Sequence, residues 1–229
     1  MSHPLRGQLY ELNIPSAEAT HVVVLTEDVW NAQMSDSVVV PVYRWPDASP
    51  SLLLVALDED LRGNCTRVQS MGHEFIGNWV GSCPDEPWVR IRVGVRKFLD
   101  VDRRIAKTPP PPLRVLRSDW WPHQNRIHFA TNTAIGPSDK LYAIISDNDW
   151  NSLPEALTAA VVRLTSKTKR QRLRWEVPLG SSFVVTGDIY SVPVVAFEQK
   201  PPRTGYPTAL TDDESAAIAV KQRSTLSLS

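Results

Sequence analysis

The sequence is poor in the residues on which disulfides and metal centres are built. Its 229 residues include only two cysteines, Cys65 and Cys83, and neither has a partner at metal-ligand spacing. The five histidines show no ligand spacing either, and there is no glycine-rich phosphate loop. We therefore expect two reduced, partly buried thiols, no metal and no cofactor.

The chain also lacks an excess of charge and any long hydrophobic run. Its 25 Lys and Arg residues balance 25 Asp and Glu residues, so a basic site has to be a local patch. No apolar run approaches the ~20 residues of a membrane span, and the N-terminal MSHPLRGQLYEL has no long apolar core. We therefore expect a cytoplasmic protein without a signal peptide or a membrane partner.

What the sequence does contain is one pattern twice. The stretches VVVLTEDVWNAQ, from Val22, and YAIISDNDWNSL, from Tyr142, each run from apolar residues through Thr or Ser to Trp-Asn. Trp30 and Trp150 lie 120 positions apart. Apolar segments follow both stretches in the same order. At about 110 residues per unit, the pattern indicates an internal duplication, because solenoid repeats run at about 20 to 50 residues.

A run of four prolines, Pro109 to Pro112, separates the two units. Consecutive prolines cannot join a helix or a central strand and favour a stiff, extended spacer. The sequence therefore predicts a first lobe over 1–103, a linker over 104–113 and a second lobe over 114–229.

Short strands and one helix per lobe are expected within this frame. β-branched and aliphatic runs of strand length occur in the first lobe as QLYEL, HVVVLT, SVVVPVY and SLLLVAL. The segment after Ser82 fits both a strand alternation and a helical stripe, and Pro84 with two following acids favours a helix capped by Ser82. In the second lobe, Thr211 and Glu214 have the spacing of a capping box.

The ordered set RGQLYEL, VVVLTEDVWN, VVVPVY and a closing helix resembles the MazF/PemK toxin family. That family consists of small CcdB-type SH3-like barrels, which mostly act as homodimers, cut single-stranded RNA without a metal and are blocked by an antitoxin peptide. The resemblance implies a mainly β fold with little helix. It implies two SH3-like barrels in one chain, each with a C-terminal helix. The chain would then be a monomer that works as an internal pseudo-dimer.

The resemblance also implies site residues. The family uses an Arg just before its second strand and a Thr at the end of the next strand; here Lys140 and Thr165 occupy those places, with Ser166 beside the Thr. Some members add an Asp on a later strand, for which Asp188 is the nearest equivalent. A cation and a hydroxyl donor suit a reaction that builds negative charge on phosphorus, although Lys lacks the two-pronged contact of Arg.

The first lobe has lost this pair, because Thr20 and Tyr43 stand at the corresponding positions. The resemblance therefore implies at most one equipped site. Five cations without an intervening acid follow Thr165 and are expected to track an RNA backbone: Lys167, Lys169, Arg170, Arg172 and Arg174. A solvated strand face and loop is the alternative interpretation of this run.

Two functions follow from these residues. The first is a MazF/PemK-like toxin, a metal-independent endoribonuclease with one surviving site, whose partners are single-stranded RNA and an antitoxin peptide or protein. The second is a nuclease-dead relative that binds a peptide, a protein or RNA. The first rests on Lys140 and Thr165 as the surviving pair, and the second, which is the alternative, draws on the Arg-to-Lys change at Lys140 and the losses in the first lobe.

Overall fold

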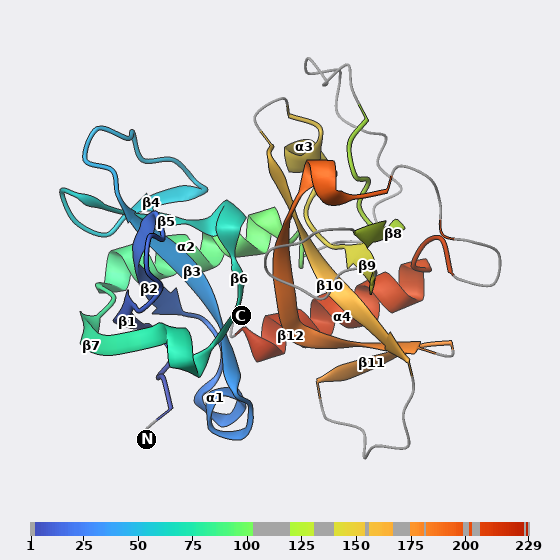
Figure 1. The fold of residues 1–229 in the computed structure, drawn as a ribbon, viewed down its shortest axis with the longest axis horizontal. Helices are drawn as coiled ribbons and strands as arrows, with labels where there is room; N and C mark the ends of the chain where they lie inside the picture. The colour runs from blue at the N-terminus through green and yellow to red at the C-terminus, as the bar shows by residue number, and fades with distance from the viewer. Residues whose placement is uncertain are drawn as a thin grey trace.

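The structure is a computed structural model that describes residues 3–102, 120–130, 140–153, 156–166, 175–180, 182–198, 202, 207–226 and 228. Figure 1 shows two lobes side by side, each built on its own antiparallel sheet. The first lobe contains the described residues up to 102, and the second contains those from 120 onward. The predicted linker, 104–113, lies outside the described residues, so the predicted boundaries stay predictions.

The sheet of the first lobe has seven strands in the order β4-β5-β3-β2-β1-β7, with β6 paired to β3. The strands are β1 (Gln8–Leu12), β2 (Ala19–Val24), β3 (Asp36–Arg44), β4 (Leu54–Ala56), β5 (Leu61–Asn64), β6 (Gln69–Gly72) and β7 (Ile76–Ser82). The valine-rich β3 is buried on both faces, which fits its continuous apolar run. The predicted strands are confirmed, although SLLLVAL forms only the three residues of β4.

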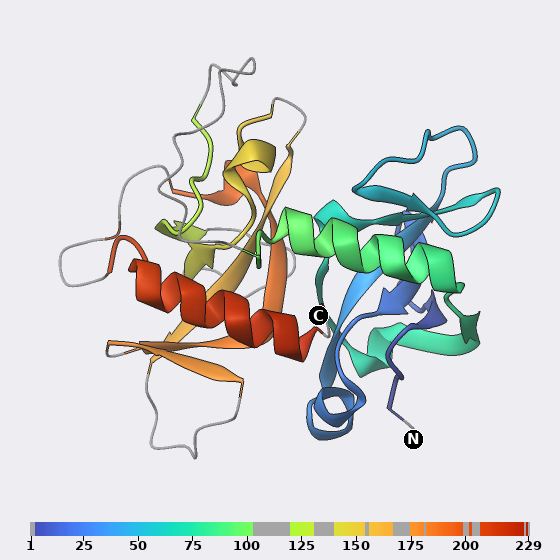
Figure 2. The same cartoon turned by 180° about the vertical axis from the view of Figure 1, so that it is seen from behind.

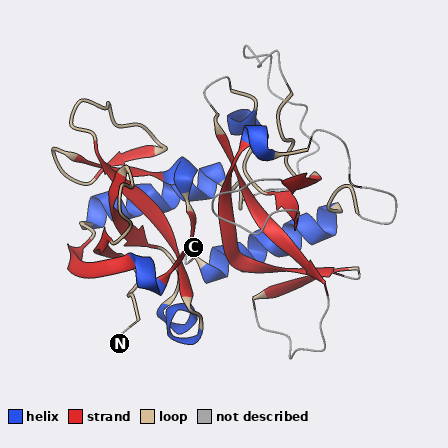
Figure 3. Ribbon diagram, in the orientation of Figure 1, coloured by secondary structure: helices blue, strands red, loops and turns tan. Residues whose placement is uncertain are grey.

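The sheet of the second lobe has five strands in the order β11-β12-β10-β9-β8. They are β8 (Ile127–Ala130), β9 (Lys140–Ile144), β10 (Thr158–Ser166), β11 (Glu176–Leu179) and β12 (Ser182–Pro193). The long β12 pairs with β10 along its length, with one register shift between Val162 and Leu164. Figure 3 shows the predominance of strand over helix in both lobes.

The expected closed barrels are not observed among the described strands. In the first lobe, β3 pairs with β6 through Asp36–Val39 and with β5 through Val42–Arg44, so the sheet splits and curls around one long strand. Its edge strands, β4 and β7, do not pair with each other. In the second lobe, β8 and β11 likewise remain separate edges. A barrel closes only when the first and last strands pair, which the described residues do not do.

Each sheet carries one long helix, as predicted: α2 (Asp85–Phe98) and α4 (Asp212–Thr225). Figure 2 shows both helices on the same side of the molecule. The capping box of Thr211 and Glu214 is confirmed. The expected cap at Ser82 is wrong, because the N-cap of α2 is Pro84 and Ser82 bonds to the Gln8 side chain instead. Neither of these 14-residue helices, nor any shorter one among the described residues, has the length and apolar character to cross a membrane.

The repeated Trp-Asn pattern forms the same local structure in both lobes, around short helices α1 (Asp28–Gln33) and α3 (Asn148–Asn151). Asn31 accepts a hydrogen bond from the Thr26 hydroxyl and donates one to the Thr26 carbonyl. Asn151 repeats both bonds with Ser146, and both asparagines are buried. The pattern therefore encodes a turn in which a buried amide holds the end of a strand.

Strand register repeats as well. Val24 pairs with Val39 between β2 and β3, and Ile144 pairs with Val161 between β9 and β10. Val24 and Ile144 each lie six positions before the repeated Trp, whereas the connection to the next strand is two residues longer in the second lobe. In both lobes the indole of the repeated Trp donates to a backbone carbonyl near the start of the next strand, that of Asp36 in the first and of Thr158 in the second.

The two lobes are packed on each other directly. One buried apolar cluster contains residues of both lobes, among them Val40 and Leu228. The Ser70 hydroxyl donates to the Gly187 carbonyl at 2.7 Å and accepts from the Ile189 N–H at 2.8 Å. A side chain at Gly187 would collide with Trp30, since an added Cβ would lie 2.6 Å from its ring. The contact face is therefore shaped by residues of both lobes.

Candidate functional site

A groove of about 770 Å³ lies where the two lobes meet. It is lined from both sides, by α1, β3 and the β6–β7 turn of the first lobe and by β10, β11 and β12 of the second. Its lining residues are Trp30, Met34, Ser35, Asp36, Gly72, Glu74, Arg163, Thr165, Glu176, Phe183, Val185, Asp188 and Tyr190. Neither lobe alone would form it.

The wall from the second lobe carries a linked set of polar side chains. Arg163 and Thr165 are two positions apart on β10, so they share one face of the sheet. Asp188 and Tyr190 are likewise two positions apart on β12, so they share one face of that strand, which pairs with β10. An Arg163 Nη2 atom lies 3.5 Å from Asp188 Oδ2, and the Tyr190 hydroxyl donates a hydrogen bond to the same carboxylate.

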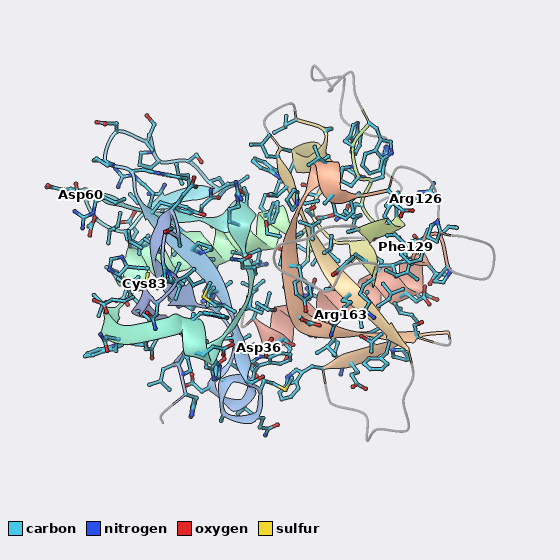
Figure 4. The ribbon with its side chains drawn as sticks, viewed as in Figure 1. Asp36, Asp60, Cys83, Arg126, Phe129 and Arg163 are labelled. Carbon is cyan, nitrogen blue, oxygen red and sulfur yellow. The ribbon has the colours of Figure 1, made fainter. Side chains whose placement is uncertain are left out.

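The wall from the first lobe is built on Asp36 and Trp30. Asp36 is the first residue of β3, and its carbonyl accepts a hydrogen bond of 3.0 Å from the Trp30 indole. Trp30 is fully buried and meets Trp175 of the second lobe edge to face, with ring centroids 4.6 Å apart. Figure 4 shows Asp36 and Arg163 on the two sides of the region where the lobes meet.

Two carboxyl groups of the groove, those of Asp36 and Asp188, have raised pKa values. Burial, together with the charges of Asp188 and Glu74, raises the pKa of Asp36 to about 6. Burial also raises the pKa of Asp188, against the Tyr190 hydrogen bond and the Arg163 charge, which lower it. Burial and the neighbouring Asp188 raise the pKa of the Tyr190 hydroxyl. Two carboxyl groups with raised pKa values in one groove are a feature of acid–base sites.

The predicted catalytic residues are distributed unevenly. Thr165 and Asp188 both line the groove. Ser166 is the last residue of β10, opposite Ser182. Lys140 is the first residue of β9, where it is exposed and does not line the groove. The structure therefore brings two of the four predicted residues into one lined site.

The predicted RNA-binding cations cannot be placed. Lys167, Lys169, Arg170, Arg172 and Arg174 all lie outside the described residues. The described part of the chain contains no group of three or more His, Cys, Asp or Glu residues arranged to hold a metal ion.

Several groove residues were missed at the sequence level. Arg163 carried a usable signal, because a strand places the residue two positions before Thr165 on the same face. Tyr190 carried the same signal, because it lies two positions after Asp188 on β12. Asp36 had no such signal, since it reaches the groove only through the packing of one lobe on the other.

The comparisons with known proteins give a limited likeness. No protein-family model matches the chain, and a search of curated proteins finds no relative. An endoribonuclease from a mycobacterial species is similar in structure, with a TM-score of 0.36 at 19% identity over 42% of this chain and 90% of its own. MazE–MazF from Deinococcus radiodurans gives a TM-score of 0.36 at 16% identity over 41% of this chain and 93% of its own. For the Mycobacterium tuberculosis toxin MazF-mt6 the TM-score is 0.33 at 13% identity, over 39% and 92% of the two chains.

Replacing Asp36 by asparagine is expected to stabilise the protein at pH 7.5. The folded state raises the pKa of Asp36 from 3.8 to about 6, so ionised Asp36 opposes folding above that pH. The variant should gain about 1 to 3 kcal/mol in free energy of unfolding at pH 7.5, and the gain should shrink as the pH falls through 6 towards 4. Urea unfolding of both proteins across this pH range measures it.

Asp60→Asn is the control for that experiment. Asp60 is an exposed carboxylate in a surface pair with Arg44. Its replacement should change stability by less than about 1 kcal/mol. An Asp36→Asn gain that stays equal at pH 4.5 and pH 7.5 would show that charge burial at Asp36 is not its cause.

Proposed function

We propose that the protein is a MazF/PemK-like, metal-independent endoribonuclease that cuts single-stranded RNA in the groove between its lobes. The observation that carries the proposal is the meeting of Thr165 and Asp188 in one groove, with the Arg163 guanidinium 3.5 Å from Asp188. These side chains come from two strands and supply a hydroxyl donor, a carboxylate and a cation.

The reaction requires those three chemical roles. Attack of the RNA 2′-hydroxyl on the neighbouring phosphorus places extra negative charge on the non-bridging oxygens. The Arg163 guanidinium neutralises that charge, and the Thr165 hydroxyl donates a hydrogen bond to one oxygen. Lys140, exposed at the entry to β9, contacts a flanking phosphate as a point charge. The cations between Lys167 and Arg174 bind the backbone beyond it.

The two lobes are, in this proposal, diverged copies that together replace a homodimer of two barrel-derived modules. The copies would be divided as predicted, into 1–103 and 114–229. The repeated hydrogen bonds of Asn31 and Asn151 and the repeated register support a common origin. Covalent linkage holds the second copy at high effective concentration, which lets one copy lose its own chemistry. An antitoxin peptide would act in the cytoplasm by occupying the groove.

A cleavage assay tests this function. The purified chain, incubated with end-labelled single-stranded RNA in excess EDTA, is expected to produce fragments that end in a 2′,3′-cyclic phosphate. Chelation should leave the rate unchanged, because the chemistry is carried by side chains. Lys140→Ala is expected to weaken RNA binding, while Lys140→Arg retains it. Intact RNA after prolonged incubation with the wild-type protein, with or without added Mg²⁺, would rule out the nuclease.

A binding module without nuclease activity is the second candidate, and the charge of the groove favours it. Among the described residues, four lining side chains are carboxylates, Asp36, Glu74, Glu176 and Asp188, and one, Arg163, is a cation. Such a groove repels phosphate unless some carboxyl groups are protonated, and it attracts a basic peptide. Salt-sensitive binding of a lysine- and arginine-rich peptide, together with no cleavage of RNA, would identify this function.

A further inference from the structure

We propose that Asp36 of the first lobe is the general acid of the site and that Asp188 of the second lobe is its general base. This inference rests on the proposed nuclease function. It assigns a catalytic side chain to the lobe whose own Lys140 and Thr165 equivalents are Thr20 and Tyr43. The active site would then be shared between the two lobes.

The placement of the two carboxyl groups carries the inference. Asp36 and Asp188 line the same groove from opposite lobes, and each is half-buried. Burial is the largest cause of the raised pKa of Asp36, and the charge of Asp188 is the next. Two carboxyl groups of one groove hold their protons with different affinity when their surroundings differ.

The surroundings decide which of the two keeps the proton. Asp188 has the Arg163 guanidinium at 3.5 Å and the Tyr190 hydroxyl as a donor, and both favour its anion. Among the described residues, Asp36 forms no ion pair. The ion pair and the hydrogen bond therefore assign the anion, and the role of base, to Asp188, and they leave the proton, and the role of acid, to Asp36.

The other charged and titratable groups around Asp36 agree with this assignment. Glu74 of the β6–β7 turn acts as a like charge on it, and Glu176 of β11 lines the same groove. His73 is bonded to the Ser37 hydroxyl at 2.9 Å, and burial lowers its pKa, so it is neutral at pH 7. Arg163 is the one lining cation in the part of the chain that the structure describes, and it forms an ion pair with Asp188.

The step balances with these two groups alone. Ionised Asp188 accepts the proton of the 2′-hydroxyl as the 2′-oxygen forms its bond to phosphorus. The bond from phosphorus to the 5′-oxygen breaks, and protonated Asp36 gives its proton to that leaving oxygen. The products are a 2′,3′-cyclic phosphate and a free 5′-hydroxyl, with Asp188 protonated and Asp36 ionised. Proton exchange with water restores both groups for the next turnover.

The corresponding position of the second lobe explains why only one such site is expected. The Trp150 indole donates to the Thr158 carbonyl at 3.4 Å, as the Trp30 indole does to that of Asp36 at 3.0 Å. Thr158 therefore occupies the place of Asp36 and has no acidic proton to give at neutral pH. A second site with the roles of the two lobes exchanged would lack the acid, because Thr158 stands at the place of Asp36. It would also lack the Thr165 hydroxyl, because Tyr43 stands at that place.

A leaving-group experiment tests the assignment. Once the cut position is mapped, the same oligonucleotide is made with sulfur in place of the bridging 5′-oxygen, because a thiolate departs without a proton. The Asp36→Asn variant is expected to cut ordinary RNA about 100-fold more slowly than the wild-type protein. It should cut the sulfur-bridged RNA at nearly the wild-type rate. Asp188→Asn is expected to be slow on both substrates, because the 2′-hydroxyl still needs a base.

The wild-type protein provides a test that needs no variant. Its cleavage of ordinary RNA should fall by about tenfold per pH unit above about pH 6, where Asp36 loses its proton, and the sulfur-bridged RNA should show no such fall. A fall with both substrates, or an equal loss on both in Asp36→Asn, overturns the assignment while the nuclease stands. No cleavage of either substrate by the wild-type protein overturns the proposed function and this inference together.

Discussion

Thr165→Ala is expected to slow RNA cleavage by about 100- to 1,000-fold while leaving the fold intact. A single preorganised donor to the developing charge typically contributes that much to a rate. Thr165 is half-buried near the end of β10 and lines the groove beside Arg163, so its hydroxyl is held where a bound phosphate would lie. Single-turnover cleavage of end-labelled RNA, with thermal unfolding as the check on folding, measures the effect.

The chain contains its own matched control for that substitution. Tyr43 occupies the position in the first lobe that Thr165 occupies in the second, so Tyr43→Phe should leave the cleavage rate within about twofold of wild type. Thr165→Ser keeps the hydroxyl and should recover most of the activity. If Thr165→Ala and Thr165→Ser lose the same activity, the position acts through packing and the proposed hydrogen bond is wrong.

Trp30→Ala is expected to lower the free energy of unfolding by about 3 to 5 kcal/mol, the usual range for deleting a buried large aromatic side chain. Trp30 is fully inaccessible, covers Gly187 and packs against Trp175, so the loss would fall on the contact between the lobes. Because its indole also bonds the Asp36 carbonyl, RNA cleavage should fall with it.

Trp79→Ala is the comparison for Trp30→Ala. Trp79 lies on the edge strand β7 and is 63% exposed, so its loss should change stability by less than about 1 kcal/mol. Equilibrium urea unfolding of the two variants separates them. If Trp30→Ala unfolds at the wild-type urea concentration, the packing of the two lobes does not depend on this side chain.

Elements that rest on local chemistry were predictable. The buried β3 follows from its unbroken valine run, and α4 follows from the capping box of Thr211 and Glu214. For α2, Pro84 and the two acids after it predicted a helix, and the burial of Ile91 and Val95 beside an exposed Val89 fits the helical stripe. Strand and helix periods depend only on neighbouring residues, so they can be recognised without knowing the rest of the fold.

Features that depend on distant partners were predicted less well. Ser82 was expected to cap α2, but its hydroxyl is taken by Gln8 of β1, a strand 74 positions earlier. The closed barrels were expected from a resemblance, whereas β3 divides its pairing between β5 and β6 and leaves the sheet open. In both cases a competing contact from another part of the chain decided the outcome.

The candidate site also combines features that follow from local sequence with features that depend on distant parts of the chain. The amino-acid sequence is enough to place Thr165 and Asp188 on strands of one lobe, and the two-residue period of a strand aligns Arg163 with Thr165. The position of Asp36 in the same groove depends on the packing of one lobe on the other, through Trp30 and Ser70. The raised pKa of Asp36 has the same origin, since burial in that contact and the charge of Asp188 cause it. A local pattern carries no information on which surfaces of two lobes will meet, so the shared groove belongs to the packing and not to either repeat.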